Sequence, residues 1–140
     1  ITGYASLYEA EMQRAYDKLT QVHKLQSNDS ALIAMDEIFN STNVIDGISG
    51  GYAVAQRLAS QKNVFVMLTT HYLYLTKLSK EGLYRNLKVD IERDENDDIQ
   101  FPYTISKGVS RERIALELMK RDNFAPELVE CALKIKTSLS

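Results

Sequence analysis

The chain has little of what marks secreted or membrane-embedded proteins. Of its 140 residues one is cysteine, two are proline and none is tryptophan. The single cysteine, Cys131, excludes an intramolecular disulfide and a zinc site built on cysteine pairs, and it favours a reducing, intracellular compartment. No apolar run approaches the roughly 20 residues that a membrane span needs. Residues 1–4 do not resemble a signal peptide, so the sequence predicts neither secretion nor membrane insertion.

An excess of one charge is also missing. The 17 Lys and Arg residues against 19 Asp and Glu residues leave a net charge of -2, so the chain has no overall basic field for a phosphate backbone. Any contact with nucleic acid is therefore expected outside this chain. A hydrophobic content of 44% and a charged content of 26% are typical of a globular domain. Because the first residue is Ile1 rather than Met, we expect a fragment of a longer protein.

Two unbroken apolar runs alternate with helical patterns. Residues 31–35 and 64–69 show no polar alternation, which is typical of parallel strands buried on both faces. Apolar residues three or four positions apart predict a helix over residues 6–26, another helix after a loop at 39–47, and a further helical stretch after residue 71. This order predicts an α/β fold, a parallel sheet with flanking helices and right-handed crossovers.

The last third of the chain has a different pattern. An alternating segment at 87–91, a charged turn at 94–98 and a short apolar segment at 99–101 predict a β-hairpin. Two helices are predicted to follow, one over residues 112–121 and one that begins at Pro126. The second of these places its apolar residues on one face: Leu128, Cys131, Ala132, Ile135 and Leu139. The predicted parts are thus a core at 6–80, a hairpin at 83–106 and C-terminal helices at 111–139.

Two adjacent carboxylates, Asp36 and Glu37, end the first apolar run. A charge at the end of a buried strand needs a cation or hydrogen bonds to offset its lost hydration. The carboxyl edge of a parallel sheet is where α/β proteins bind ligands, and an apolar run into Asp-Glu matches the Walker B pattern of phosphoryl-transfer enzymes. For an isolated Asp-Glu pair, two solvated acids at the start of a loop remain the alternative.

A histidine, His71, ends the second apolar run and is therefore expected at the same edge as Asp36 and Glu37. A lone histidine is more often structural. A titratable side chain beside two carboxylates is, however, what a sensor of a γ-phosphate requires. The other histidine, His23, lies among polar residues and is expected to be exposed.

These motifs occur in a specific order. The first run reads Leu32-Ile33-Ala34-Met35-Asp36-Glu37-Ile38, and it is followed by Thr42, Asp46-Gly47 and Thr69-Thr70-His71-Tyr72. This series closely resembles the ATPase domain of the MutS family of DNA mismatch repair proteins. Residues 6–12 resemble the family's Ser-Thr-Phe segment ending in Glu-Met, residues 101–110 its hairpin and Gly-x-Ser turn, and residues 125–129 the start of its late helix. The resemblance covers nearly the whole chain.

The resemblance implies the C-terminal half of a P-loop NTPase domain of the ABC type, with ATP and Mg²⁺ as cofactors. By matching position, it implies that Asp36 supports Mg²⁺ through water, that Glu37 is the catalytic glutamate, and that His71 is a switch histidine facing the γ-phosphate. Residues 40–47 occupy the D-loop, which in the family touches the opposing subunit, and Ser6 matches a serine that reaches the partner's nucleotide. The positions implied to bind nucleotide are Ser6, Asp36, Thr42, Asp46 and Thr70.

The implied partners are a second subunit, as a homo- or heterodimer, and mismatched double-stranded DNA bound by domains outside this chain. Two departures bear on these expectations. Where the family usually has Gly-Arg-Gly, this chain has Phe39-Asn40-Ser41, which indicates a divergent member and bears on signalling across the dimer interface. The chain also contains no Gly-x-x-x-x-Gly-Lys-Ser/Thr, so by itself it is expected to bind ATP weakly.

Three alternatives stay open at this point. The chain could be a catalytically silent dimerisation or interaction module of the same fold, or part of a family member that serves recombination. It could also belong to another ABC-class ATPase, such as a double-strand-break repair protein. The segment 48–52 resembles the signature of ABC transporters, but that signature precedes Walker B and this segment follows it. Small residues that allow close helix packing explain the segment better.

Overall fold

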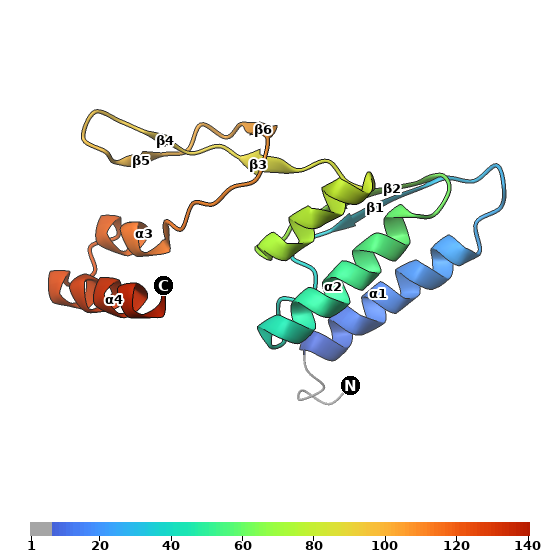
Figure 1. Cartoon of the computed structure of the whole chain (residues 1–140), viewed down its shortest axis with the longest axis horizontal. Helices are drawn as coiled ribbons and strands as arrows, with labels where there is room; N and C mark the ends of the chain where they lie inside the picture. Colours follow the sequence, from blue (N-terminus) through green and yellow to red (C-terminus); the bar gives the residue numbers. More distant parts are fainter. Residues whose placement is uncertain (1–6) are drawn as a thin grey trace. The chain divides into compact units, whose positions relative to one another are not determined.

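The computed structural model describes residues 7–140, which form two compact units, one that ends at Val109 and one at Ser110–Ser140. The first unit contains helix α1 (Leu7–His23), strand β1 (Ala31–Met35), helix α2 (Val44–Ala59), strand β2 (Val64–Leu68), the 3₁₀ helix η1 (Leu73–Glu81) and short strands within residues 87–107 (Figure 1). The second unit contains helices α3 (Ala115–Arg121) and α4 (Pro126–Leu139).

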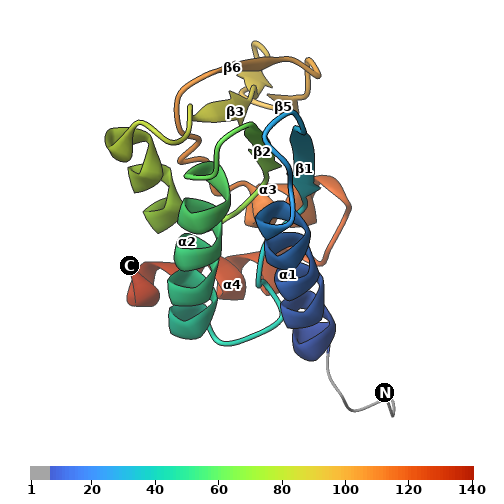
Figure 2. The ribbon, with the colours of Figure 1, turned by 90° about the vertical axis from the view of Figure 1, so that its right-hand side faces the viewer.

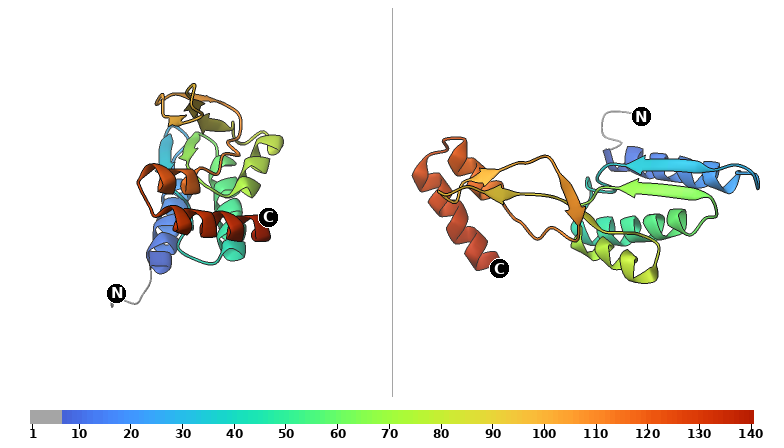
Figure 3. Two further views of the ribbon diagram at one scale, coloured as in Figure 1. Left: turned by 90° about the vertical axis from the view of Figure 1, so that its left-hand side faces the viewer. Right: turned by 90° about the horizontal axis from the view of Figure 1, so that it is seen from above.

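The two predicted parallel strands are present. Strand β1 pairs with β2 in parallel, from Ala31 opposite Val64 to Met35 opposite Leu68. Helix α2 forms the crossover between them, and both strand arrows point the same way in Figure 3. Within residues 7–140 this sheet has two strands. These elements support a mixed α/β fold, whereas the wider sheet of a P-loop NTPase stays a prediction.

The core of the first unit lies between this sheet and its helices. One cluster joins Val22 of α1, Ile33 of β1 and Leu58 of α2, and Leu58 is fully buried. A second cluster joins Ala15, Ile38, Phe39 and Leu75, so it links α1, the segment after β1 and η1. Figure 2 shows α1 and α2 running side by side, as their contacts require. The segment that follows β1 is thereby part of the core.

The other face of the sheet is exposed in the described part of the chain, and the expectation that both strands are buried on both faces is wrong here. Leu32 is 71% exposed, and Phe65 and Met67 are each 66% exposed. Successive side chains of a strand point to opposite faces. Because the core clusters of α1 and α2 contain Ile33, Val64 and Val66, the alternate residues of the same strands remain uncovered.

Helix α2 begins earlier than predicted, because the residues expected in a loop at 39–47 include its first turn. Asn43 is the N-cap, and its side-chain oxygen accepts a hydrogen bond from the backbone N–H of Asp46 at 2.9 Å. This bond satisfies one of the unpaired N–H groups at the start of the helix. The helical stretch predicted after residue 71 is confirmed as a 3₁₀ helix, η1, which ends at Gly82 with a positive φ of 74°.

The predicted hairpin is present as an antiparallel ribbon, but residues 87–89 pair with residues 105–107 rather than with the expected segment at 99–101. Strand β3 (Leu87–Val89) pairs with β6 (Ile105–Lys107), and β4 (Glu92–Arg93) pairs with β5 (Ile99–Gln100). Between the ladders the Asp90 carboxylate accepts hydrogen bonds from Ser106 Oγ at 2.5 Å and Thr104 Oγ1 at 2.7 Å. These bonds lower the pKa of Asp90. Leu87 and Val89 are exposed, so the apolar side chains of β3 do not face the core.

The second unit is a pair of packed helices. Helix α3 is shorter at its start than the predicted 112–121, and α4 begins at Pro126 as predicted. Val129 of α4 is buried, whereas most of the predicted apolar stripe is exposed, including Leu128, Ile135 and Leu139. Cys131 is also exposed as a free thiol. The stripe is therefore an apolar surface of this unit rather than its core.

Candidate functional site

The carboxyl ends of β1 and β2 bring the predicted polar residues to one edge of the sheet. Past the last paired residues, the backbone N–H of Thr69 donates to Met35 O, and the N–H of Glu37 donates to Thr69 O, both at 3.0 Å. These bonds continue the parallel pairing beyond the strands. Asp36 and Glu37 therefore lie next to the segment that carries His71.

Glu37 and His71 are in direct contact. The Nε2 atom of His71 lies 2.7 Å from Oε1 of Glu37, and their side chains are 86% and 38% exposed, respectively. Glu37 has a φ of 53°, in the left-handed region that non-glycine residues rarely adopt. This backbone turn follows directly after the strand. The pair is open to water and can therefore meet a ligand from solvent.

The neighbouring carboxylate, Asp36, is bonded to a residue that the sequence reasoning did not select. Thr69 Oγ1 donates to Asp36 Oδ1 at 2.5 Å and accepts from the backbone N–H of Glu37 at 2.9 Å. One hydroxyl thus contacts the side chain of Asp36 and the backbone of Glu37. The predicted nucleotide-binding residue Thr70 lies in the turn instead, where its Oγ1 accepts from the backbone N–H of Tyr72 at 2.9 Å.

The loop after Glu37 is held in place from several sides. Phe39 is 6% exposed, has a φ of 53°, and packs edge-on against Tyr8 with ring centroids 6.2 Å apart. Its carbonyl oxygen accepts a hydrogen bond from the Tyr72 hydroxyl at 2.9 Å. Gly47 permits this bond, because a Cβ atom at that position would lie 2.4 Å from the Tyr72 hydroxyl oxygen. The bend after Glu37 is therefore anchored in the core.

Gly50 and Gly51 belong to the same packing arrangement. A Cβ atom at Gly50 would lie 3.2 Å from the ring of Phe39, and one at Gly51 would lie 3.3 Å from Ile38. The resemblance of residues 48–52 to a transporter signature is therefore explained by close packing of α2 against the loop, as the alternative interpretation predicted.

Two polar residues of this loop bind acids. Asn40 Nδ2 donates to Glu37 Oε2 at 2.6 Å, and Ser41 Oγ donates to Glu11 Oε2 of α1 at 2.7 Å. The sequence reasoning noted both residues as departures from the family pattern and placed them in the D-loop, but it predicted no partner for either within the chain. The signal that could have found Asn40 is its spacing, three residues after Glu37 in a tight turn.

A carboxylate connects α2, the helix before β2, to η1, the 3₁₀ helix that follows His71. Glu81 accepts hydrogen bonds from the Tyr52 hydroxyl and from Gln56 Nε2. The bond to Glu81 raises the pKa of Tyr52 to about 12, and the same contact lowers the pKa of Glu81. This contact joins α2 to η1, the helix that follows the segment carrying His71.

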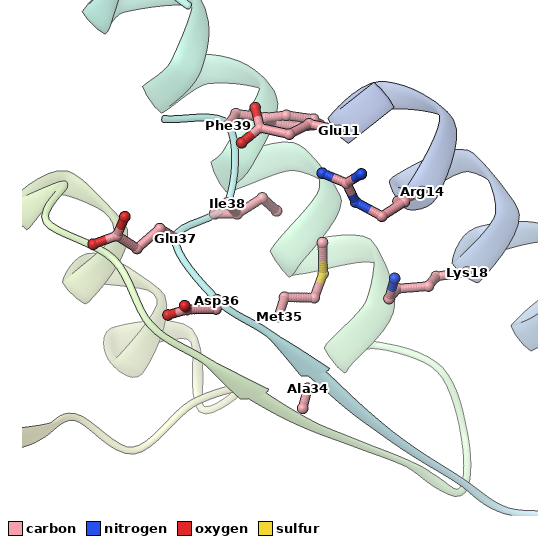
Figure 4. Close-up of a pocket in the computed structure, with 9 residues that line it drawn as sticks. All are labelled: Glu11, Arg14, Lys18, Ala34, Met35, Asp36, Glu37, Ile38 and Phe39. Carbon is pink, nitrogen blue, oxygen red and sulfur yellow. The ribbon is translucent and has the colours of Figure 1, made fainter. Parts of the chain in front are cut away.

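A hollow of about 260 Å³ lies between α1 and the end of β1. It is lined by Glu11, Arg14, Lys18, Ala34, Met35, Asp36, Glu37, Ile38 and Phe39. Figure 4 shows Arg14 and Lys18 extending from α1 on one side of Met35, while the carboxylates of Asp36 and Glu37 point away from α1, toward the segment after β2. The acids are therefore presented to the sheet edge rather than paired with these cations.

The chemistry of this edge fits Mg²⁺. Mg²⁺ prefers hard oxygen ligands, keeps several waters and is usually bound through one or two carboxylates together with substrate phosphates. Asp36, Glu37 and the hydroxyl of Thr69 supply such oxygens side by side. Within residues 7–140, no group of three or more His, Cys, Asp or Glu side chains is arranged to hold a metal ion.

Comparison with known proteins decides the family. The family model described as MutS domain V matches residues 3–140. This chain belongs to the MutS family of DNA mismatch repair proteins. The predicted resemblance is confirmed, and the alternative of an unrelated ABC-class repair ATPase is set aside.

Individual MutS relatives agree with this assignment. A DNA mismatch repair protein MutS from Persephonella marina is 29% identical over 111 residues, which are 78% of this chain and 12% of that protein. One from Prochlorococcus marinus is 31% identical over 115 residues, with 81% and 12% covered. MutS protein homolog 4 of Mus musculus is 31% identical over 123 residues, again with 81% and 12% covered. The chain thus spans about an eighth of the length of these relatives.

The residues that the MutS resemblance singles out fall into two groups. Asp36, Glu37 and His71 come together at the sheet edge, whereas Asp46 lies in the first turn of α2, where its carboxylate accepts from Asn43 Nδ2 at 2.5 Å. Thr42 is half-buried just before that helix. Ser6 lies outside the described residues. The roles assigned to all these positions stay predictions.

The structure also bears on membrane association. Among the described helices, none is long and apolar enough to cross a membrane.

His23, the other histidine, is exposed at the end of α1 as predicted.

Proposed function

We propose that the predicted core at 6–80 is the Walker B, D-loop and switch-histidine part of a MutS ATPase. The observation that carries this proposal is the 2.7 Å contact between His71 Nε2 and Glu37 Oε1, beside Asp36 and at the carboxyl edge of a parallel sheet. A carboxylate and a titratable imidazole placed together at such an edge are suited to orienting a water and sensing phosphate.

Each residue has a role in this proposal. Asp36, oriented by the Thr69 hydroxyl, would hold Mg²⁺ through water. The metal, when bound with ATP, would offset negative charge on the phosphates. Glu37 would accept a hydrogen bond from the attacking water and orient it, and its 38% exposure leaves room for that water. His71, which is 86% exposed, would contact the γ-phosphate.

The proposal extends to assembly. In a MutS-type dimer, residues 40–47 and Ser6 would face the opposing subunit, and mismatched DNA would be bound by other parts of the protein. The net charge of -2 supports placing DNA contact outside this chain. An intracellular location also stays a prediction, supported by the single free cysteine.

A second candidate is a catalytically silent dimerisation module. The observation in its favour is that both oxygens of Glu37 are already engaged, one by His71 and one by Asn40. A role in recombination rather than mismatch repair is equally compatible with this site, because the role proposed for the site concerns nucleotide and not DNA.

The test compares Glu37→Gln with the unaltered protein, using the natural gene product that contains residues 1–140. This change removes the charge that orients water and leaves the neighbouring backbone in place. We expect ATP hydrolysis to fall about 10²-fold or more. The affinity for ATP should change little, because Glu37 does not form the phosphate cradle.

The matched control is Glu95→Gln in the charged turn of the ribbon, which should leave both quantities unchanged. Steady-state turnover and nucleotide affinity are measured on the same samples. Normal turnover in Glu37→Gln would mean that Glu37 is a loop acid. Tight ATP binding with no turnover in the unaltered protein would favour the silent module.

A further inference from the structure

We propose that Asn40 is a positioning residue that holds the carboxylate of Glu37 in the orientation needed for water activation. This inference rests on the proposed ATPase function. It concerns a residue for which the sequence reasoning predicted no partner within the chain.

The first step of the argument is the bond itself. Asn40 Nδ2 lies 2.6 Å from Glu37 Oε2. A carboxylate can only accept hydrogen bonds, so the amide nitrogen of Asn40 must be the atom that faces it. Because the acceptor is charged, this bond is stronger than one between neutral groups.

The second step is that the two bonds to Glu37 act on different oxygens. His71 contacts Oε1 at 2.7 Å and Asn40 donates to Oε2. A glutamate has three rotatable side-chain bonds, and a single contact would leave its carboxylate free to rotate. Contacts on both oxygens fix the plane of the group. Each carboxylate oxygen can accept more than one hydrogen bond, so acceptor positions for a water remain.

The third step is that Asn40 is itself held by both of its neighbours. On one side Phe39 is buried and its carbonyl oxygen accepts from the Tyr72 hydroxyl at 2.9 Å. On the other side Ser41 donates to Glu11 of α1 at 2.7 Å. Asn40 is thus anchored on one side through Phe39 to Tyr72, in the segment after β2, and on the other side through Ser41 to α1. A rigidly placed donor can orient its acceptor with little entropic cost.

The experiment is a double-mutant cycle in the natural gene product that contains residues 1–140. Asn40→Ala should lower kcat about tenfold, as expected for loss of a hydrogen bond to a charged group, with unchanged nucleotide affinity. Asn40→Asp should lower kcat further, since a second carboxylate cannot donate and repels Glu37. In a Glu37→Ala background, Asn40→Ala should cause no additional loss, because the group through which Asn40 acts is gone.

A nucleotide-free measurement accompanies the kinetics. Thermal unfolding without ATP of the unaltered protein, Asn40→Ala, Glu37→Ala and the double variant should give non-additive changes in Tm, because the two side chains bond each other before any nucleotide binds. The control is Asn28→Ala, which makes the same chemical change in the turn before β1 and should leave kcat and Tm unchanged.

The outcomes separate the two proposals. If Glu37→Ala abolishes turnover while Asn40→Ala has normal kcat, the positioning role is wrong and the ATPase proposal stands. An equal loss from Asn40→Ala in both backgrounds, or a parallel loss of nucleotide affinity, would overturn the inference in favour of a general effect on folding. A higher kcat in Asn40→Ala would also overturn it, because the bond would then restrain Glu37. Normal turnover in Glu37→Ala would overturn both proposals.

Discussion

His71 Nε2 lies 2.7 Å from Glu37 Oε1, although the two residues are 34 positions apart in the sequence. The contact depends on the parallel register that sets Met35 opposite Leu68, because this register brings the residues after each strand to the same edge. A shift of one residue in β1 relative to β2 would turn its side chains to the other face of the sheet. The register of the sheet therefore determines the geometry of the candidate site.

The first prediction concerns His71. In the natural gene product, His71→Ala should lower ATP turnover about tenfold or more. Glu37 would lose one of its two contacts, and the γ-phosphate would lose the side chain proposed to sense it. The free energy of unfolding should change by less than about 0.5 kcal/mol, since the side chain is exposed. Steady-state ATPase assays and thermal unfolding measure the two effects. His23→Ala, at the other exposed histidine, is the control and should have normal turnover.

The second prediction concerns Gly47. A Cβ atom there would lie 2.4 Å from the Tyr72 hydroxyl and 2.7 Å from Phe39 O, so Gly47→Ala must displace the bond between these residues. Overpacking of this kind should lower the free energy of unfolding by about 1–3 kcal/mol. Chemical denaturation of Gly47→Ala is compared with that of Ser49→Ala on the exposed side of the same helix. Equal stability of the two variants would show that Tyr72 moves aside freely.

The third prediction concerns the exposed sheet face formed by Leu32, Phe65 and Met67. Apolar faces of this kind recruit other protein surfaces, so the isolated 140-residue polypeptide should self-associate. It should also bind Mg-ATP weakly, because it contains no Gly-x-x-x-x-Gly-Lys-Ser/Thr. Sedimentation with a fluorescent ATP analogue tests both statements. Replacing Phe65 and Met67 together by threonine should reduce the association, whereas replacing exposed Thr137 of α4 by serine should not. A monodisperse monomer that binds Mg-ATP at micromolar concentration would contradict this prediction.

The fourth prediction concerns the ribbon. The Asp90 pKa is lowered first by the hydrogen bond from Ser106 and second by that from Thr104. A carboxyl group whose pKa is lowered by folding stabilises the fold above its unfolded pKa, and this contribution is lost as the pH falls toward the folded value. Ser106→Ala should therefore raise the pKa of Asp90 and weaken the acid dependence of ribbon stability. NMR titration of the Asp90 carboxyl carbon measures the shift, and an unchanged pKa in Ser106→Ala would assign the effect to Thr104.

Several elements could be predicted because their cause is local. Residues 31–35 and 64–68 are continuous runs of apolar residues that suit strands, and the segments between them carry helical spacing. Pro126 begins α4, since its missing N–H costs nothing in the first turn. Asp36, Glu37 and His71 could be placed at one edge because the carboxyl ends of parallel strands share an edge.

Other features depended on contacts that spacing does not reveal. Asn43 extended α2 backward by capping it, which a polar, glycine-containing segment did not suggest. Leu32 and Phe65 are as apolar as Ile33 and Val66, and only the positions of α1 and α2 decide which of them are buried. An apolar pattern states which side chains favour burial, but the packing of other elements determines which face is covered.

The family, the order of the motifs and the identity of the acids and the histidine follow from residue type along the chain. Which partners these groups have follows from the fold. Thr69 rather than Thr70 binds Asp36, and Asn40 binds the free oxygen of Glu37. The reason is physical: a hydrogen bond requires atoms within about 3 Å in a fixed direction. Such placement arises from the strand register and from the anchoring of Phe39, not from separation in sequence.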